Sequence, residues 1–290
     1  MKASILYLIM GVLFFFNTKF AYSQMIINSN LLTMPVLVEL PNTKLYGSGF
    51  FYGDSNSIFL VTAKHVLFEL EHNSLIDSQA VIYSYPHNPE KDDPNILNID
   101  LKELIKLNRY ILSGKQDICA IEIAKTTLTE DSSNFLVQYF KYIEKSGPST
   151  RISSYNVIQT TSFDSTKVST DLFIFGYPIS LSSERQFDYK RPILRKGIIA
   201  GKNELTKTLI IDCPVYPGNS GGPVVIQEQK SLGYFVYTIV GIVSEYIPFK
   251  DYWQSISNKR IVHEEAYNSG LSVVVPIDEL FEILSLYKYK

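Results

Sequence analysis

Residues 216–223 contain a single serine, Ser220, among three glycines. The flanking segments, residues 209–211 and 224–226, are apolar and rich in β-favouring residues. Glycine serves where the backbone needs a positive φ or where another group must approach closely, so the pattern predicts a shaped loop that presents a hydroxyl group. Backbone N–H groups of such a loop could stabilise the negative charge that develops in acyl transfer. A glycine-rich hairpin turn explains the loop equally well when it is considered alone.

A serine nucleophile needs a base to remove its proton, and the base needs a carboxylate to orient it. His65 directly follows a predicted strand at residues 57–62 and is the candidate base. Asp117 begins an alternating segment, residues 117–123, and is the candidate carboxylate. Three further histidines are expected at the surface: His72, His87 and His263.

A second chemistry would use the same serine. Residues 218–222 also fit the G-x-S-x-G nucleophile elbow of α/β-hydrolases, which needs an aspartate and then a histidine downstream. Asp251 and His263 follow in that order. The elbow must lead from a strand into a helix, however, and residues 221–226 are a poor helix start. Because no regular β/α alternation precedes the serine either, the sequence disfavours this alternative.

Six short motifs occur in one order along the chain: Gly47-Ser48-Gly49-Phe50, Thr62-Ala63-Lys64-His65, Asp117-Ile118-Cys119-Ala120, Phe175-Gly176-Tyr177-Pro178, Gly218-Asn219-Ser220-Gly221-Gly222-Pro223 and Gly241-Ile242-Val243-Ser244. With these motifs the chain resembles the trypsin-like (chymotrypsin-fold) serine peptidases, and within them the bacterial HtrA/Deg-like branch. The resemblance covers roughly residues 34–283.

The resemblance implies a role for each matching residue. His65 would be the general base, Asp117 its orienting carboxylate and Ser220 the nucleophile. The backbone N–H groups of Gly218 and Ser220 would form the oxyanion hole, and Ser244 would help to hold Asp117. The pocket for the side chain preceding the cut bond would be lined by Pro214, Val215, Tyr216, Val243, Glu245 and Tyr246.

The expected pocket predicts a preference for small or medium uncharged side chains. No aspartate stands at Pro214 to pair with lysine or arginine, and the ring of Tyr246 should narrow the entrance. An apolar, shallow pocket gains from burying methyl groups but does not offset the desolvation of a charge. Glu245 would reverse this preference if its side chain turned into the pocket.

The chain also departs from the family pattern. Digestive-type members carry an aspartate before the nucleophile, which pairs with a freed N-terminal amine, whereas this chain has Asn219. Activation by insertion of a new N-terminus is therefore not expected. The chain ends soon after the peptidase motifs, so we expect no peptide-binding PDZ domain.

The expected fold is all-β, with two antiparallel six-stranded barrels and the active site between them. A connecting helix at residues 134–145 and a C-terminal helix complete it. The expected segments are a signal peptide (1–23), a trypsin-like peptidase domain (24–290), barrel one (about 32–130), a linker (about 131–166), barrel two (about 167–276) and the C-terminal helix (277–287).

The first 23 residues are typical of a secretory signal peptide. Lys2 precedes an apolar run at residues 5–16, and Ala21-Tyr22-Ser23 is a small-x-small cleavage pattern that places the mature start at Gln24. We therefore expect an exported protein, secreted or periplasmic, with no membrane span in the mature chain. The net charge of −2 gives no electrostatic reason to bind nucleic acid.

Together these features predict a serine endopeptidase that acts on protein or peptide substrates through an acyl-enzyme intermediate, as a monomer and without a cofactor or metal. Asp92-Asp93 lacks the regular ligand spacing of a calcium loop. The alternative is a catalytically silent protein that holds a peptide or partner in the same cleft. Cys119 and Cys213 could form a disulfide or remain free thiols.

Overall fold

The fold is seen in a computed structural model, which describes residues 29–128, 135–149, 153–156, 159–179, 188–231, 234–254 and 261–287. The expected signal peptide at residues 1–23 lies outside the described residues. In the described residues, no helix is both long and apolar enough to cross a membrane.

The first half of the chain builds a ten-stranded sheet. Neighbouring strands follow the order β6-β7-β3-β2-β1-β4-β5-β9, while β8 pairs with β7 and β10 runs parallel to β2. Their bounds are β1 (Pro35–Leu40), β2 (Leu45–Gly53), β3 (Ser57–Thr62), β4 (Gln79–Ser84), β5 (Asn95–Asp100), β6 (Tyr110–Leu112), β7 (Cys119–Leu128), β8 (Phe135–Tyr139), β9 (Ile143–Ser146) and β10 (Ser154–Tyr155).

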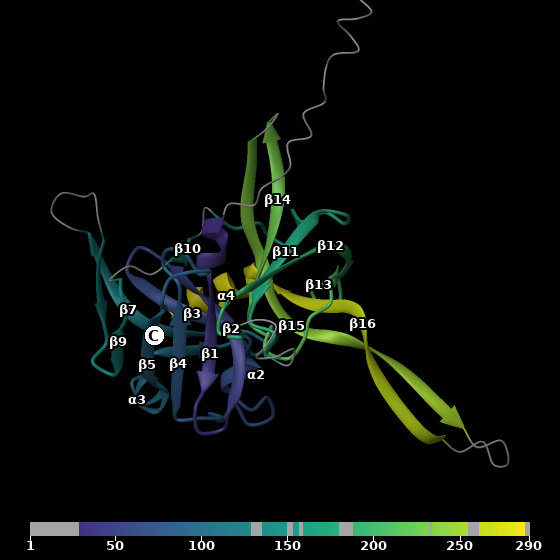
Figure 1. The fold of residues 1–290 in the computed structure, drawn as a ribbon, viewed down its shortest axis with the longest axis horizontal. Helices are drawn as coiled ribbons and strands as arrows, with labels where there is room; N and C mark the ends of the chain where they lie inside the picture. The colour runs from purple at the N-terminus through teal and green to yellow at the C-terminus, as the bar shows by residue number, and fades with distance from the viewer. Residues whose placement is uncertain are drawn as a thin grey trace, which may run out of the picture.

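The second half closes into a six-stranded antiparallel barrel in the order β11-β12-β13-β16-β15-β14 (Figure 1). Apolar side chains alternate toward its interior, where they form a buried core of their own. Its strands are β11 (Asp171–Gly176), β12 (Ile193–Asn203), β13 (Thr208–Asp212), β14 (Pro223–Ser231), β15 (Tyr234–Gln254) and β16 (Ile261–Pro276). The all-β, two-barrel class is thereby confirmed.

Among the helices that lie wholly within the described residues, all are short. They are the 3-10 helix η1 (Ser29–Thr33) and the α-helices α2 (Lys64–Leu67), α3 (Leu101–Lys106) and α4 (Ile277–Tyr287). The predicted C-terminal helix is confirmed as α4, with Asp278 and Glu279 in its first turn, where the helix dipole favours acids. Its apolar face packs back onto the first sheet, where Phe281 meets Tyr52 and Tyr287 meets Phe59. The helix thereby ties the end of the chain to its first half.

The predicted connecting helix at residues 134–145 is wrong. Its described part forms two strands, β8 and β9, which pair with β7 and β5. Apolar residues recur there at spacings that suit a helix, but most are aromatic or β-branched, and the edges of β7 and β5 offer backbone partners. Because β8, β9 and β10 extend the first sheet, this sheet has ten strands rather than the six expected.

Strands β15 and β16 are longer than the sequence predicts. The β-favouring residues predict strands at residues 234–245 and 271–275, whereas the structure continues β15 to Gln254 and begins β16 at Ile261. The extra residues form a two-stranded arm that projects away from the barrel (Figure 1). Bulges between Tyr246 and Pro248, and the positive φ of Gly270, mark where the arm leaves it.

Candidate active site

His65 and Asp117 stand at the ends of neighbouring strands. His65 lies in α2, directly after β3, and Asp117 lies two residues before β7, the antiparallel partner of β3. The turn before Asp117 is shaped by Ser113, whose hydroxyl accepts hydrogen bonds from the N–H groups of Lys115 and Gln116 (both 2.9 Å). The sheet therefore brings residues 52 positions apart into contact.

Both oxygens of the Asp117 carboxylate have hydrogen-bond partners. Its Oδ2 lies 2.7 Å from Nδ1 of His65, and its Oδ1 accepts the backbone N–H of His65 at 3.0 Å. The Ser244 hydroxyl donates to Oδ2 at 2.7 Å. Burial raises the pKa of Asp117, but these hydrogen bonds and the neighbouring imidazole outweigh it, so the net pKa lies below its ordinary value. The group is therefore held as a carboxylate facing the imidazole.

Two glycines make the Ser220 loop possible. Gly218 and Gly221 have φ of +100° and +83°, values that side chains rarely adopt. A Cβ on Gly221 would lie 2.2 Å from the carbonyl oxygen of Ser48 and 2.7 Å from the N–H nitrogen of Ala63. The loop is thus pressed against the backbone two residues before His65, which the sequence could not reveal.

Ser48 and Asn219 hold the loop, and neither was predicted to have this role. The Ser48 hydroxyl donates to the Gly218 carbonyl at 2.6 Å and accepts the N–H of Tyr177 at 2.9 Å. The Ser48 N–H donates to the Ser220 carbonyl at 2.8 Å. The Asn219 side chain accepts the N–H of Tyr216 at 3.0 Å. Their motifs were visible in the sequence, but the contacts depend on the fold.

The Ser220 hydroxyl donates to the Ser244 carbonyl at 3.1 Å. Ser244 therefore joins Ser220 to Asp117, because its carbonyl contacts one residue and its hydroxyl the other. Within the described chain, the N–H groups of Gly218 and Ser220 have no hydrogen-bond partner. The structure thus brings together His65, Asp117 and Ser244 directly, and Ser220 through Ser244.

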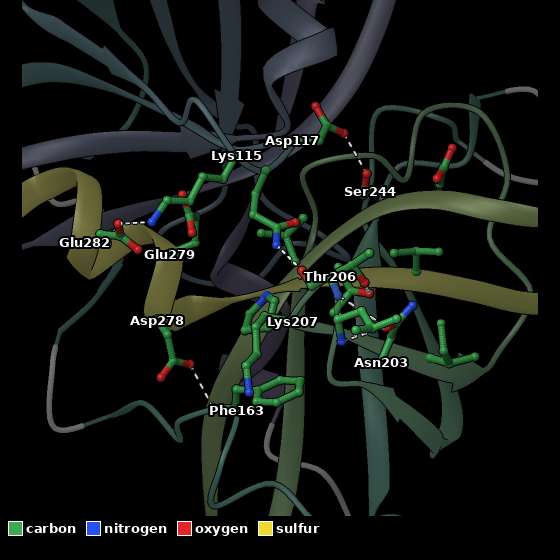
Figure 2. A pocket seen from close by; sticks show the side chains of 18 of the residues that line it. Lys115, Asp117, Phe163, Asn203, Thr206, Lys207, Ser244, Asp278, Glu279 and Glu282 are labelled. Atoms are coloured by element: carbon green, nitrogen blue, oxygen red, sulfur yellow. Dashed lines mark hydrogen bonds and ion pairs between the residues drawn. The ribbon is translucent and has the colours of Figure 1, made fainter.

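A cavity of about 900 Å³ opens beside Asp117 and Ser244 (Figure 2). Figure 2 shows the acidic residues of α4 on one side and the turn between β12 and β13 on the other. Glu279 accepts a hydrogen bond from Ser113, and Glu282 forms an ion pair with Lys115. Because both contacts reach the turn that precedes Asp117, α4 helps to position that carboxylate.

The six predicted pocket residues are not gathered in this cavity, since only Glu245 lines it. Val215 and Val243 are buried, whereas Glu245 and Tyr246 are exposed. Sequence reasoning also missed a cation at this place. The Arg195 guanidinium lies 4.5 Å from the Tyr216 ring centroid and donates to the Pro214 carbonyl at 2.9 Å. A positive charge therefore stands beside two of the expected pocket residues: Pro214 and Tyr216.

Other candidate chemistries find no support in the described residues. Asp251 and His263, the elbow alternative's partners, both lie on the arm, at exposed positions. Cys119 and Cys213 are free and buried, and burial raises the pKa of both thiols, that of Cys213 to about 11. In the part of the chain that the structure describes, no group of His, Cys, Asp and Glu side chains is arranged to hold a metal ion.

A family model for the trypsin-like peptidase domain matches residues 47–233, which is more than half of the 290 residues. The chain belongs to the trypsin-like peptidase family. The matched residues include His65, Asp117 and Ser220. No curated protein sequence matches this chain significantly.

Solved structures of similar proteins include the HtrA-type protease AlgW with tripeptide (14% identity, TM-score 0.46) and a serine endoprotease from Yersinia pestis (14%, 0.41). The matches cover 88% of this chain and 60% and 62% of those two chains, so this chain spans less than two thirds of their length. The protease Anisep from Arthrobacter nicotinovorans is 14% identical with a TM-score of 0.43, and the match covers 84% of this chain and 88% of that one.

Proposed function

We propose that the protein is an exported serine endopeptidase that cuts peptide bonds through an acyl-enzyme intermediate. Membership of the trypsin-like peptidase family supports a serine protease. The observation that carries the proposal is the Asp117 carboxylate, which contacts both Nδ1 and the backbone N–H of His65. This pair of contacts fixes the imidazole with Nε2 free to act as a base.

The proposed reaction begins with rotation of Ser220 about its Cα–Cβ bond, which takes Oγ from the Ser244 carbonyl to Nε2 of His65. His65 removes the Oγ proton while Oγ bonds to the substrate carbonyl carbon. The resulting oxyanion accepts hydrogen bonds from the N–H groups of Gly218 and Ser220. His65 then gives its proton to the leaving amine, and a water molecule releases the acyl group by the same steps.

Several residues act in this proposal by positioning the reacting groups. Ser244 adds a donor to the Asp117 carboxylate and so favours its ionised form. Ser48 fixes the Gly218 carbonyl, and with it the orientation of the adjacent peptide group. Export through cleavage of residues 1–23 rests on the sequence pattern alone.

The proposal is tested by hydrolysis of fluorescently labelled casein by the purified mature protein and by its Ser220→Ala variant. We expect release of labelled peptides by the wild type and none above background by the variant, with both proteins giving the same circular dichroism spectrum. Equal hydrolysis by the two proteins would contradict the proposal. A folded wild type without hydrolysis would favour the silent binding protein.

A further inference from the structure

The arm formed by β15 and β16 is a continuation of the candidate active site. Beyond Val243, β15 pairs only with β16 within the described chain, because its pairing with β14 ends at Ile242. The open edge begins at Ser244, whose carbonyl contacts the Ser220 hydroxyl. The base of the arm is also fixed to the site, since the Asn268 side chain donates to the Val215 carbonyl at 2.6 Å.

The arm carries large apolar side chains that face water. Five of the exposed aromatic residues of the described chain belong to β15 and β16: Tyr246, Phe249, Tyr252, Trp253 and Tyr267. Trp253 and Phe249 each expose 59% of their surface. An isolated two-stranded ribbon is marginally stable in water, and exposed aromatic clusters are typical of binding surfaces. The composition of the arm therefore indicates a surface that a partner covers.

The arm's two faces differ in charge balance. Alternation places Phe249, Asp251 and Trp253 on one face. Directly opposite them stand Tyr267, Glu265 and His263, respectively. We call these six residues the aromatic–acidic face, on which aromatic side chains flank two opposed carboxylates. Glu265 accepts a hydrogen bond from the Tyr267 hydroxyl and lies 2.9 Å from Nε2 of His263, whereas Asp251 has no side-chain partner within the described residues. Like charges directly opposite each other are destabilising unless a cation lies between them.

The other face already neutralises its own charges. Lys250 and Glu264 lie on it and form an ion pair at 2.8 Å, beside Tyr252 and Ala266. On the arm, the carboxylate without a side-chain partner among the described residues is therefore Asp251 on the aromatic–acidic face, which favours a partner with a positive charge between two apolar groups. In an extended peptide, side chains at positions i, i+2 and i+4 point to the same side and present this pattern.

We propose that the aromatic–acidic face binds the polypeptide substrate itself, through a segment in which Lys or Arg alternates with apolar residues. The proposal rests on the proposed peptidase function. About nine residues, or about 30 Å of strand, separate Ser244 from Trp253. A substrate that runs antiparallel to β15 from its cut bond places its upstream residues along the arm.

Pro248 determines how the arm holds this segment. Proline has no N–H group, so a substrate strand cannot pair without interruption along the edge of β15. The substrate segment must therefore be bound by side chains of the aromatic–acidic face rather than by a continuous row of backbone hydrogen bonds. Short peptides that end before the arm would gain nothing from it, whereas long unfolded chains would bind at both places.

Trp253 is the only tryptophan of the chain, so its fluorescence reports on the arm. The Ser220→Ala protein is titrated with two tryptophan-free 15-residue peptides that carry Leu-Thr-Lys-Thr-Leu or Leu-Thr-Glu-Thr-Leu. We expect a blue shift of the emission and a Kd at least about tenfold lower for the lysine peptide. The D251N/E265Q variant should lose this preference, while the control Glu264→Gln on the opposite face should keep it.

Equal affinity for the two peptides, or an unchanged preference in the D251N/E265Q variant, would overturn the proposal. A blue shift that follows protein concentration without peptide would also overturn it, because a second copy would then cover the face. Binding is measured without catalysis, so the two proposals fail separately. Hydrolysis without peptide binding contradicts the proposed role of the aromatic–acidic face. Peptide binding without hydrolysis by the wild type contradicts the proposed peptidase function.

Discussion

The hydroxyl of Ser244 lies 2.7 Å from Oδ2 of Asp117, the same oxygen that Nδ1 of His65 contacts at 2.7 Å. Two donors on one oxygen stabilise its negative charge, and this is part of why the pKa of Asp117 lies below its ordinary value despite burial. Because Ser244 also begins the open edge of β15, it connects the Asp117 carboxylate to the strand that we propose binds the substrate.

Ser244→Ala should lower kcat/KM about tenfold, equivalent to about 1.4 kcal/mol in the transition state. The substitution removes one charge-assisted hydrogen bond from Asp117, so its pKa should rise and the imidazolium formed during the reaction should be less stabilised. Steady-state hydrolysis of a peptide substrate measures the change. Ser285→Ala, which removes a hydroxyl contact to a backbone carbonyl in α4, is the control and should leave kcat/KM unchanged. Equal kcat/KM for Ser244→Ala and the wild type would contradict this role.

Gly221→Ala should abolish activity and lower the melting temperature. The new Cβ would lie 2.2 Å from the Ser48 carbonyl oxygen at a φ of +83°, so the loop must move or unfold, at a cost of at least about 2 kcal/mol. Gly114→Ala is a matched control close to Asp117, because its Cβ would meet no atom within 4 Å. Thermal unfolding and hydrolysis are compared for both variants. A fully active Gly221→Ala protein would refute the loop geometry.

The contacts of the Glu122 carboxylate depend on its negative charge and should therefore weaken in acid. Its side chain is fully buried and bonds to Arg109, Lys125, Ser57 and Tyr287. Burial raises the pKa of Glu122, but these partners outweigh it and the net pKa is lowered. A lowered folded-state pKa contributes stability that is present above the unfolded value, about 4.3, and is lost as the pH falls through the folded-state value.

Glu122→Gln should therefore destabilise the protein by about 2 kcal/mol at pH 7. This is less than the loss expected for a fully buried pair, because the partner cations are partly exposed. The difference in melting temperature from the wild type should shrink below about pH 4, where the wild type loses the same contacts. Tyr287→Phe, which keeps the carboxylate, should cost only about 1 kcal/mol. A pH-independent difference for Glu122→Gln would contradict the assignment.

Arg195 should slow the cleavage of substrates that carry a basic residue directly before the cut bond. Its guanidinium lies beside Pro214 and Tyr216, so a lysine there would meet a like charge. We expect the wild type to cleave after Val or Leu at least about tenfold faster than after Lys. Arg195→Gln should lower the ratio of the cleavage rate after Val or Leu to that after Lys by about threefold. Chromogenic peptides that differ only at that residue measure it, and faster cleavage after lysine by the wild type would instead implicate Glu245.

Residue types and spacing were enough to predict that His65 and Asp117 act together. His65 follows one clearly predicted strand, and Asp117 begins the alternating segment that predicts another. The roles of Ser48 and Arg195 were not visible, since each depends on contacts between strands far apart in sequence. The helix predicted at residues 134–145 failed because short aromatic segments fit both periodicities until a sheet edge offers partners. The arm was missed because proline and glycine disfavour regular strands, whereas Pro248 and Gly270 here lie within β15 and β16, at the base of the arm.

Labelling with a fluorophosphonate, followed by mass spectrometry of the digested protein, tests the central claim most directly. The reagent reacts with a serine only where a base and an oxyanion hole activate it. We predict one adduct per chain, on Ser220, which is absent in Ser220→Ala and strongly reduced in Asp117→Asn. A folded wild type without an adduct, or an adduct that persists in Ser220→Ala, would contradict the claim that Ser220, His65 and Asp117 form a working catalytic site.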